Sequence, residues 1–410
     1  MELIKKYIAV ILVFAAVLTF VSCAKDGKSS SEQIVMPAYV ENGVPEKMKE
    51  TSRLVEGNKA RLAKVFKKAR QGKPITVAFL GGSITQGVSA GYEYCYATLT
   101  TRWLQQTFPK SEITGLNYGI GATGSYIGVG RVDRHVLAAK PDLVFVEFSV
   151  NDYKENTKRN VEAYTGIMKK LWYADSSPAV VAIAMTMENG TSFQEYHNAI
   201  CSENDIPMIS YHDAVLEAID NNNLAWSDVA DDVIHPNIVG HAILTELITS
   251  YLQDVLDNMD TIDITDEPAD IVGSDKYVTA SIVVPTDNQK IEGKGWEIIS
   301  DNQFFGFGSY WRTESKDGSF KDVEPLKFEV EAKSIGIIFG MMVQNGGKFD
   351  VVVDGKTVTT IDSHFKEGWG NYPEAEEVVE FNECSHHTLE IVPCAGQETA
   401  VTVLAFLLTK

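Results

Sequence analysis

The sequence has few cysteines, and their spacing does not match the common metal-binding motifs. Five cysteines occur among 410 residues, with no Cys-x-x-Cys pair and no cysteine–histidine cluster at zinc spacing. We therefore predict no metal site. Basic residues are also scarce, because 36 lysines and arginines stand against 56 aspartates and glutamates and leave a net charge of −20. Such a charge repels a phosphate backbone, so we expect no nucleic-acid partner.

The N-terminal residues are predicted to be an export and anchoring segment. Two lysines precede the apolar run at 8–21, which is shorter than the roughly 20 apolar residues of a membrane span and predicts a signal peptide over residues 1–22. Cys23 then follows a small residue and resembles a bacterial lipobox, although Phe20 stands where leucine is usual. The alternative is an ordinary signal peptide with an incidental cysteine. On the lipobox interpretation, residues 23–35 are a lipidated Cys23 and a flexible tether that anchors an exported protein to the membrane of the bacterial cell envelope or surface.

Residues 36–262 alternate between apolar runs and amphipathic helical segments. The runs are almost continuously apolar and lie at 75–80, 113–118, 143–149, 179–186 and 207–210. Continuous apolar strands between helices predict a parallel sheet covered on both faces, as in three-layer α/β/α folds of the flavodoxin-like type. Ligands of such sheets bind at the carboxyl ends of the strands.

The sequence changes character after an acidic segment at 263–276, which contains proline and glycine and is predicted to be a linker. Residues 277–410 contain many short strand-like runs, and the pair Asp354-Gly355 favours a two-residue hairpin turn. This pattern predicts a β-sandwich, of jelly-roll type. Cys384 and Cys394 flank one of the runs, and the sequence leaves open whether they form a disulfide.

The first candidate for chemistry is Ser83, which directly follows the apolar run at 75–80 within the sequence GGSITQG. A serine at a tight strand-to-helix turn exposes its hydroxyl at the functional edge of the sheet, which suits a nucleophile. The alternative is a plain glycine-rich turn in which Ser83 caps a helix. The pattern is neither G-x-S-x-G nor a phosphate-binding loop.

Two further segments follow later strands. The sequence NYGIGATGS at 117–125 is a loop whose backbone N–H groups could point at a developing oxyanion, although by itself it is only a crossover. Asn151 ends the apolar strand at 143–149, and its amide could donate to the same oxyanion. The alternative is that Asn151 or Asp152 caps the next helix.

The last segment is DDVIHPN at 231–237, just before the final helix of this region. Asp232 precedes His235 by three residues, so one turn of chain can bring its carboxylate to one ring nitrogen and leave the other nitrogen facing outward. A single Asp-x-x-His pair is weak evidence, because most histidines are satisfied by local structure. The order of the four segments along the chain carries more weight than any one of them.

Together, the four segments resemble the SGNH, or GDSL-like, hydrolase superfamily, whose blocks centre on a serine, a glycine, an asparagine and a histidine. The resemblance covers roughly residues 36–260. It implies that Ser83 is the nucleophile, although the usual Gly-Asp-Ser is Gly-Gly-Ser here, and that Asn151 is an oxyanion-hole residue. Asp232 and His235 match the Asp-x-x-His of the last block.

The second block departs from the family, because Ala122 stands where the oxyanion-hole glycine is common. Backbone donation does not require glycine. The resemblance therefore implies three donors to the oxyanion, which are the N–H of Ser83, the side chain of Asn151 and the N–H of Ala122. Gly121 is the alternative to Ala122. The implied mechanism is two-step acyl transfer without a cofactor, in which His235 takes the proton of Ser83 and Asp232 orients the imidazole.

The substrate is inferred from context. An exported SGNH domain followed by a β-sandwich is similar to carbohydrate esterases that remove acetyl groups from plant polysaccharides such as xylan or mannan. Aromatic residues of 277–410 could stack on sugars, although most are expected to fill the core. The alternatives are a lipase or thioesterase acting on longer acyl chains, and a catalytically inactive glycan-binding protein at the cell surface.

Overall fold

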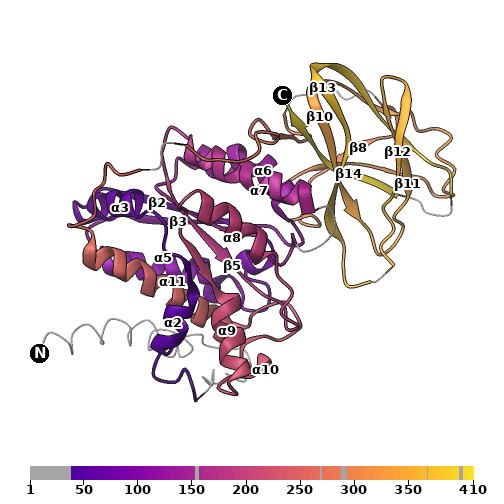
Figure 1. The fold of residues 1–410 in the computed structure, drawn as a ribbon. Helices are drawn as coiled ribbons and strands as arrows, with labels where there is room; N and C mark the ends of the chain where they lie inside the picture. The colour runs from indigo at the N-terminus through magenta and orange to yellow at the C-terminus, as the bar shows by residue number, and fades with distance from the viewer. Residues whose placement is uncertain (1–37, 153–156, 268–269, 288–292, 367, 397–399) are drawn as a thin grey trace, which may run out of the picture.

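The computed structural model describes residues 38–410 except 153–156, 268–269, 288–292, 367 and 397–399. An α/β region and a β region lie side by side (Figure 1). The predicted signal peptide, Cys23 and the tether fall outside the described residues. Within the described ranges, none of the helices is both long enough and apolar enough to cross a membrane.

A six-stranded sheet forms the centre of the α/β region, in the order β1-β6-β5-β4-β2-β3. Its strands are β1 (Arg53–Val55), β2 (Ile75–Gly81), β3 (Ile113–Gly119), β4 (Leu143–Glu147), β5 (Ala179–Ala184) and β6 (Met208–Ser210). β1 pairs antiparallel with β6, and the other five strands are parallel. The parallel strands have the 2-1-3-4-5 order of flavodoxin-like sheets, which confirms the predicted fold class. The switch point of this order lies between β2 and β4.

Helices cover both faces of the sheet, because each has an apolar side that it must bury. One face packs against α2 (Glu46–Ser52), α3 (Ala60–Arg70), α5 (Tyr96–Thr107), α9 (Tyr211–Asp220) and α11 (Ile238–Asn258). The other packs against α6 (Ser125–Arg131), α7 (Thr157–Trp172) and α8 (Gln194–Glu203). The shorter helices are α4 (Ser83–Gln86), η2 (Tyr92–Tyr94), η3 (Val132–Val136), η4 (Leu137–Ala139) and α10 (Trp226–Val229).

The β region is an eight-stranded antiparallel sheet in which β12-β11-β13-β10-β14-β9-β8 are neighbours and β7 also pairs with β14. Its strands are β7 (Ser281–Val283), β8 (Glu297–Ile299), β9 (Tyr310–Glu314), β10 (Leu326–Met341), β11 (Lys348–Val353), β12 (Lys356–Asp362), β13 (Tyr372–Pro393) and β14 (Ala400–Thr409). Register shifts interrupt the pairing of β10 with β13, and such bulges let long strands bend. The sheet curls around a core that includes Trp311, Phe328 and Phe406.

Two local expectations for the β region have clear outcomes. Asp354 and Gly355 form the predicted turn between β11 and β12, and both have positive φ, as a tight hairpin requires. Cys384 and Cys394 are both free. Cys384 lies on β13 and Cys394 directly follows the last residue of that strand, and an extended strand rises about 3.3 Å per residue, so the two thiols are much too far apart to bond.

The two regions share one apolar core rather than meeting through a loose contact. A continuous cluster of buried residues joins Ile127 and Ile167 of the α/β region to Ile282 and Leu407 of the β region. Gly130 of α6 lies at the contact, where an added Cβ would meet Ile282 Cγ2 at 2.8 Å and Leu407 Cδ1 at 3.1 Å. The absence of a side chain at this position therefore lets β7 and β14 approach the helix closely.

The segment predicted as a linker also contacts the α/β region. The Glu267 carboxylate accepts hydrogen bonds from Arg61 and Lys64 on α3. Ile271 is buried, and its N–H donates to the Tyr173 hydroxyl. Most of the described connection therefore follows the surface of the first region, which helps to fix the two regions relative to each other.

The shared core predicts that damage to the interface destabilises both regions together. We expect Leu407→Ala to lower the free energy of unfolding by about 2–5 kcal/mol, because it deletes a buried side chain at the contact. The half-exposed Ile298 is the control, and Ile298→Ala should stay within about 0.5 kcal/mol of the wild type. Denaturant unfolding followed by far-UV circular dichroism and by tryptophan fluorescence measures both. Two separate transitions, only one of them shifted, would contradict the shared core.

Candidate active site

The sheet brings the four sequence segments to one edge. β2, β3 and β4 are adjacent parallel strands, so the residues that follow them emerge at the same end of the sheet, at the switch point. Ser83 follows β2, the loop at 120–124 follows β3, and Asn151 lies four residues after β4. The Asp232–His235 segment reaches this edge from the loop before α11.

Ser83, His235 and Asp232 are joined by a chain of hydrogen bonds. Ser83 Oγ lies 2.9 Å from His235 Nε2, and His235 Nδ1 lies 2.8 Å from Asp232 Oδ2. In the tautomer that fits both contacts, Ser83 donates to Nε2 while the Nδ1–H donates to Asp232. The residue Ser83 is 9% exposed and the His235 side chain 19% exposed, so the reacting hydroxyl is reachable from solvent. This is the geometry of a serine nucleophile with its general base.

Asp232 is held as an oriented carboxylate. Its Oδ1 accepts the N–H groups of Ile234 and His235, each at 2.7 Å, and its backbone carbonyl accepts the indole N–H of Trp226 at 2.7 Å. Partial burial opposes ionisation, but the hydrogen bonds from the His235 side chain and from these two N–H groups outweigh it and lower the pKa of Asp232. Asp232 therefore stays ionised and keeps the proton of His235 on Nδ1.

The loop after β3 forms a tight turn in which Ala122 has a φ of 58°. The Thr123 N–H and hydroxyl both donate to the Ile120 carbonyl and close the turn. A positive φ costs an alanine about 1 kcal/mol relative to glycine, which gives a physical reason why glycine suits this position. Gly121 donates its N–H to Gln86 Oε1 at 2.7 Å. Because that group is engaged, the turn favours Ala122 over Gly121 as an oxyanion donor.

Asn151 lies directly against the backbone of the nucleophile turn. A Cβ added to Gly82 would meet Asn151 Oδ1 at 2.2 Å and the Thr123 carbonyl at 3.3 Å. Glycine at this position, where the family usually has aspartate, therefore lets the Asn151 amide approach Ser83. Asp152 has a different role, because its buried carboxylate accepts the Ser125 N–H at 2.7 Å and lies 3.0 Å from His197 Nε2.

The close approach at Gly82 predicts a specific loss of activity. Gly82→Ala should displace the Asn151 amide and lower kcat about 100-fold, the typical effect of losing one oxyanion donor. Asn151→Ala should cause a similar loss, and the double variant should be little worse than either, because both changes remove the same interaction. Kinetics on 4-nitrophenyl acetate measure all three. Fully multiplicative losses would contradict the proposed coupling.

Sequence reasoning missed several polar residues around the nucleophile. Gln86 contacts the oxyanion loop, as described above, and Arg131 of α6 donates to carbonyls at the ends of β2 and β3. Glu147 at the end of β4 accepts a hydrogen bond from Thr85 Oγ1 at 3.3 Å. No local motif marks these residues, since each acts through a contact that only the tertiary fold creates.

Glu147 is fully buried, and this burial raises its pKa to about 8. In the unfolded chain the pKa of a glutamate is about 4.3, so between these values unfolding releases a proton and rising pH destabilises the folded state. We expect the stability of Glu147→Gln relative to the wild type to increase by about 3 kcal/mol from pH 5 to pH 8. Chemical denaturation at both pH values tests this. The exposed Glu297→Gln is the control, and a pH-independent difference for Glu147→Gln would contradict the argument.

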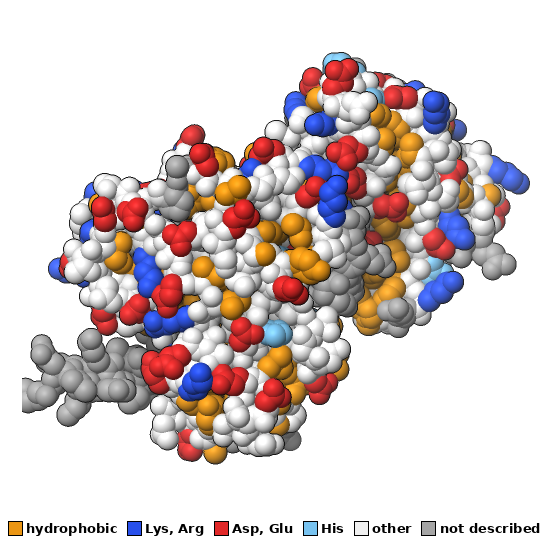
Figure 2. All heavy atoms as spheres, viewed as in Figure 1, with side chains coloured by type: hydrophobic (Ala, Val, Ile, Leu, Met, Phe, Trp, Pro, Cys, Tyr) orange, Lys and Arg blue, Asp and Glu red, His pale blue; other side chains and the backbone are white. Residues whose placement is uncertain are grey.

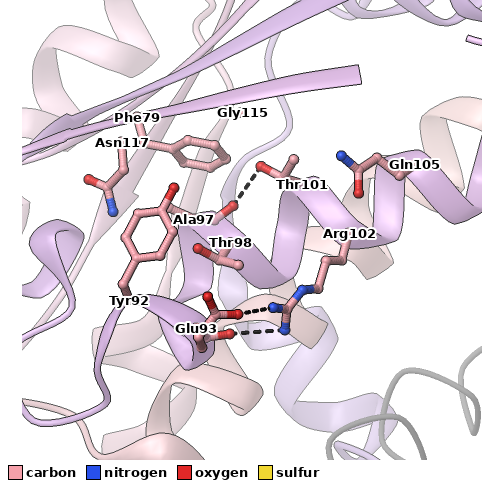
Figure 3. Close-up of a pocket in the computed structure, with 10 residues that line it drawn as sticks. All are labelled: Phe79, Tyr92, Glu93, Ala97, Thr98, Thr101, Arg102, Gln105, Gly115 and Asn117. Atoms are coloured by element: carbon pink, nitrogen blue, oxygen red, sulfur yellow. Dashed lines mark hydrogen bonds and ion pairs between the residues drawn. The ribbon is translucent and has the colours of Figure 1, made fainter. Parts of the chain in front are cut away.

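A separate cavity of about 280 Å³ lies between α5 and the edge strand β3 (Figure 3). Its lining is largely polar and includes Tyr92, Glu93, Arg102 and Asn117, with Glu93 and Arg102 joined in an ion pair. None of the three residues of the hydrogen-bonded chain lines it. Asn117 donates its amide to the Thr85 carbonyl, so the cavity lies behind the nucleophile helix α4 rather than over the triad.

Comparison with known proteins finds one matching family model and several similar solved structures. Residues 79–243 match the model of the GDSL-like Lipase/Acylhydrolase family. Two structures of a two-domain esterase (CEX) active on acetylated mannans are similar to this chain. The one co-crystallized with mannopentaose has 26% sequence identity and a TM-score of 0.79, and the other has 27% identity and a TM-score of 0.78. Each match covers 88% of this chain and 98% of the esterase. The acetyl xylan esterase AlAXEase is 25% identical with a TM-score of 0.37, over 43% of this chain and 98% of the esterase. Among curated protein sequences none matches significantly.

Proposed function

We propose that this chain, a carboxylic ester hydrolase whose residues 79–243 match the model of the GDSL-like lipase/acylhydrolase family, removes O-acetyl groups from a plant polysaccharide. The observation that carries the proposal is the hydrogen-bonded chain from Ser83 Oγ through His235 to Asp232. These three residues supply the nucleophile and the base of the reaction without any further group.

The reaction proceeds in two steps. His235 Nε2 takes the proton of Ser83 as Oγ attacks the acetyl carbonyl carbon, and the negative charge develops on the carbonyl oxygen. The N–H groups of Ser83 and Ala122 and the Asn151 amide stabilise that oxygen, each by about 3 kcal/mol. The C–O bond to the sugar then breaks, and its oxygen takes the proton from His235. A water molecule, activated by the same histidine, attacks the acetyl-serine and releases acetate.

The similarity to the two-domain esterase active on acetylated mannans favours mannan as the polymer, with xylan as the second candidate. That similarity extends over both regions of this chain, so the β region belongs to the comparison. Acidic side chains are spread over both regions on the face shown in Figure 2. A net charge of −20 repels anionic polymers and suits a neutral glycan.

The β region offers aromatic surface for a glycan and also touches the site. Phe304 and Trp311 fill its core, as expected for most of its aromatics, but Trp369 is 61% exposed and stacks on Tyr372 at 4.8 Å between ring centroids. Gly306 lies against the oxyanion loop, because an added Cβ would meet Ile120 Cδ1 at 2.3 Å. A polymer that extends beyond Ser83 could therefore also contact the β region.

We also propose that the protein is exported and anchored by a lipid on Cys23. The proposal is supported by the basic residues, the short apolar run and the small residue before Cys23 in the sequence. A lipid anchor would hold the enzyme at the cell surface, where large polysaccharides are accessible. Mass spectrometry of the membrane fraction, compared with Cys23→Ala, tests the anchor directly.

The decisive experiment measures acetate release by the chain without residues 1–23 on acetylated mannan, acetylated xylan and a long-chain ester. We expect release from mannan first, and a loss of at least about 1000-fold in Ser83→Ala, because the nucleophile is removed. Preferential hydrolysis of the long-chain ester would favour a lipase or thioesterase. Binding to the glycans without release from any ester would identify an inactive glycan-binding protein.

A further inference from the structure

The carbonyl of Gly81, two residues before Ser83, is held by two donors. It accepts the Ile120 N–H at 3.0 Å and Arg131 Nη2 at 3.3 Å. The position of Ser83 therefore depends on these contacts.

Arg131 connects this carbonyl to the two other parts of the oxyanion region. Its Nη1 donates to the Tyr118 carbonyl at 3.0 Å, near the end of β3, and its Nη2 also donates to Thr123 Oγ1 at 3.3 Å. Thr123 closes the turn that presents Ala122, as its hydroxyl donates to the Ile120 carbonyl at 2.7 Å. One guanidinium thus touches the end of β2, the end of β3 and the oxyanion turn.

The charge of Arg131 is buried without a compensating carboxylate. Arg131 is 0% exposed, and the ion pairs found among the described residues do not include it. Burial lowers its pKa to about 9, which still leaves the guanidinium charged at neutral pH. Backbone carbonyls stabilise the cation only in part, so burying this charge costs free energy that an apolar side chain of similar length would not cost.

We propose that Arg131 is a positioning residue for the acyl-transfer reaction, which holds Ser83 and the Ala122 turn in register and offsets the negative charge of the tetrahedral intermediate. The inference rests on the proposed function. The oxyanion of the intermediate is a negative charge that forms near the buried positive charge of Arg131. That positive charge therefore stabilises the intermediate more than it stabilises the neutral ester. Arg131 therefore contributes to kcat and little to ground-state binding.

The test uses Arg131→Met, which keeps the length but not the charge, and Arg131→Lys, which keeps the charge but loses the fork of donors. On 4-nitrophenyl acetate we expect Arg131→Met to lower kcat about 100-fold with KM within about twofold, and Arg131→Lys to fall between it and the wild type. Inhibition by phenylboronic acid, which forms an anionic tetrahedral adduct with serine, should weaken in Arg131→Met in proportion to kcat.

Arg61→Met is the matched control. Arg61 is 9% exposed and donates to the carbonyls of Trp172 and Pro178, near the opposite ends of the strands. It should lower the thermal midpoint while kcat stays within about twofold of the wild type, since a loss of stability alone does not change the rate of the folded enzyme.

The outcomes separate the inference from the proposed function. Folded Arg131→Met with kcat or boronic-acid affinity close to those of the wild type overturns the inference and leaves the esterase function intact. A wild type without activity on any ester overturns both. If Arg131→Met does not fold, Arg131→Lys decides the matter: it loses the fork of donors that contacts Gly81, Tyr118 and Thr123 and should lower kcat about tenfold at unchanged KM, and an unchanged kcat counts against the inference.

Discussion

The hydrogen bond between Ser83 Oγ and His235 Nε2 joins segments that are 152 residues apart in the sequence. It forms only if β2 ends at the switch point of the sheet and α11 begins close to it. The first condition is met by the parallel pairing of β2 with β3 and β4. The second is met because α11 packs along α5 and α3 through a long apolar side. The catalytic geometry is therefore a consequence of how the sheet and its helices bury apolar surface.

The fold class and the Asp232–His235 pair could be predicted because both are encoded locally. Apolar runs separated by helical patterns determine a parallel sheet, and a spacing of three residues lets Asp232 reach His235. The edge strand β1 was missed, since its three residues carry no periodic signal and pair with β6 only through the tertiary fold. Strand pairing between residues far apart in the sequence cannot be predicted from a short stretch of sequence.

The environment of the nucleophile was predictable only in part, for the same reason. The glycine-rich turn around Ser83 is visible in the sequence, but the need for glycine at position 82 arises from Asn151, which comes from a different strand. The preference for Ala122 over Gly121 depends on the side chain of Gln86. Arg131 and Glu147 resemble ordinary helix and strand residues until their buried contacts are known. Such residues are determined by geometry rather than by motif.

The two buried ionisable groups Glu147 and Arg131 differ in charge at neutral pH. Glu147 has its pKa raised to about 8 by burial, so it is mostly protonated at neutral pH, whereas Arg131 remains charged. Arg131 therefore places a positive charge behind Ser83, in a site that also contains the carboxylates of Asp152 and Asp232, while the chain as a whole has a net charge of −20. Surface charges are screened by water and salt, but buried charges act at short range in a medium of low polarity. The charge of Arg131 therefore acts on the forming oxyanion at short range, and the acidic surface influences which polymers approach.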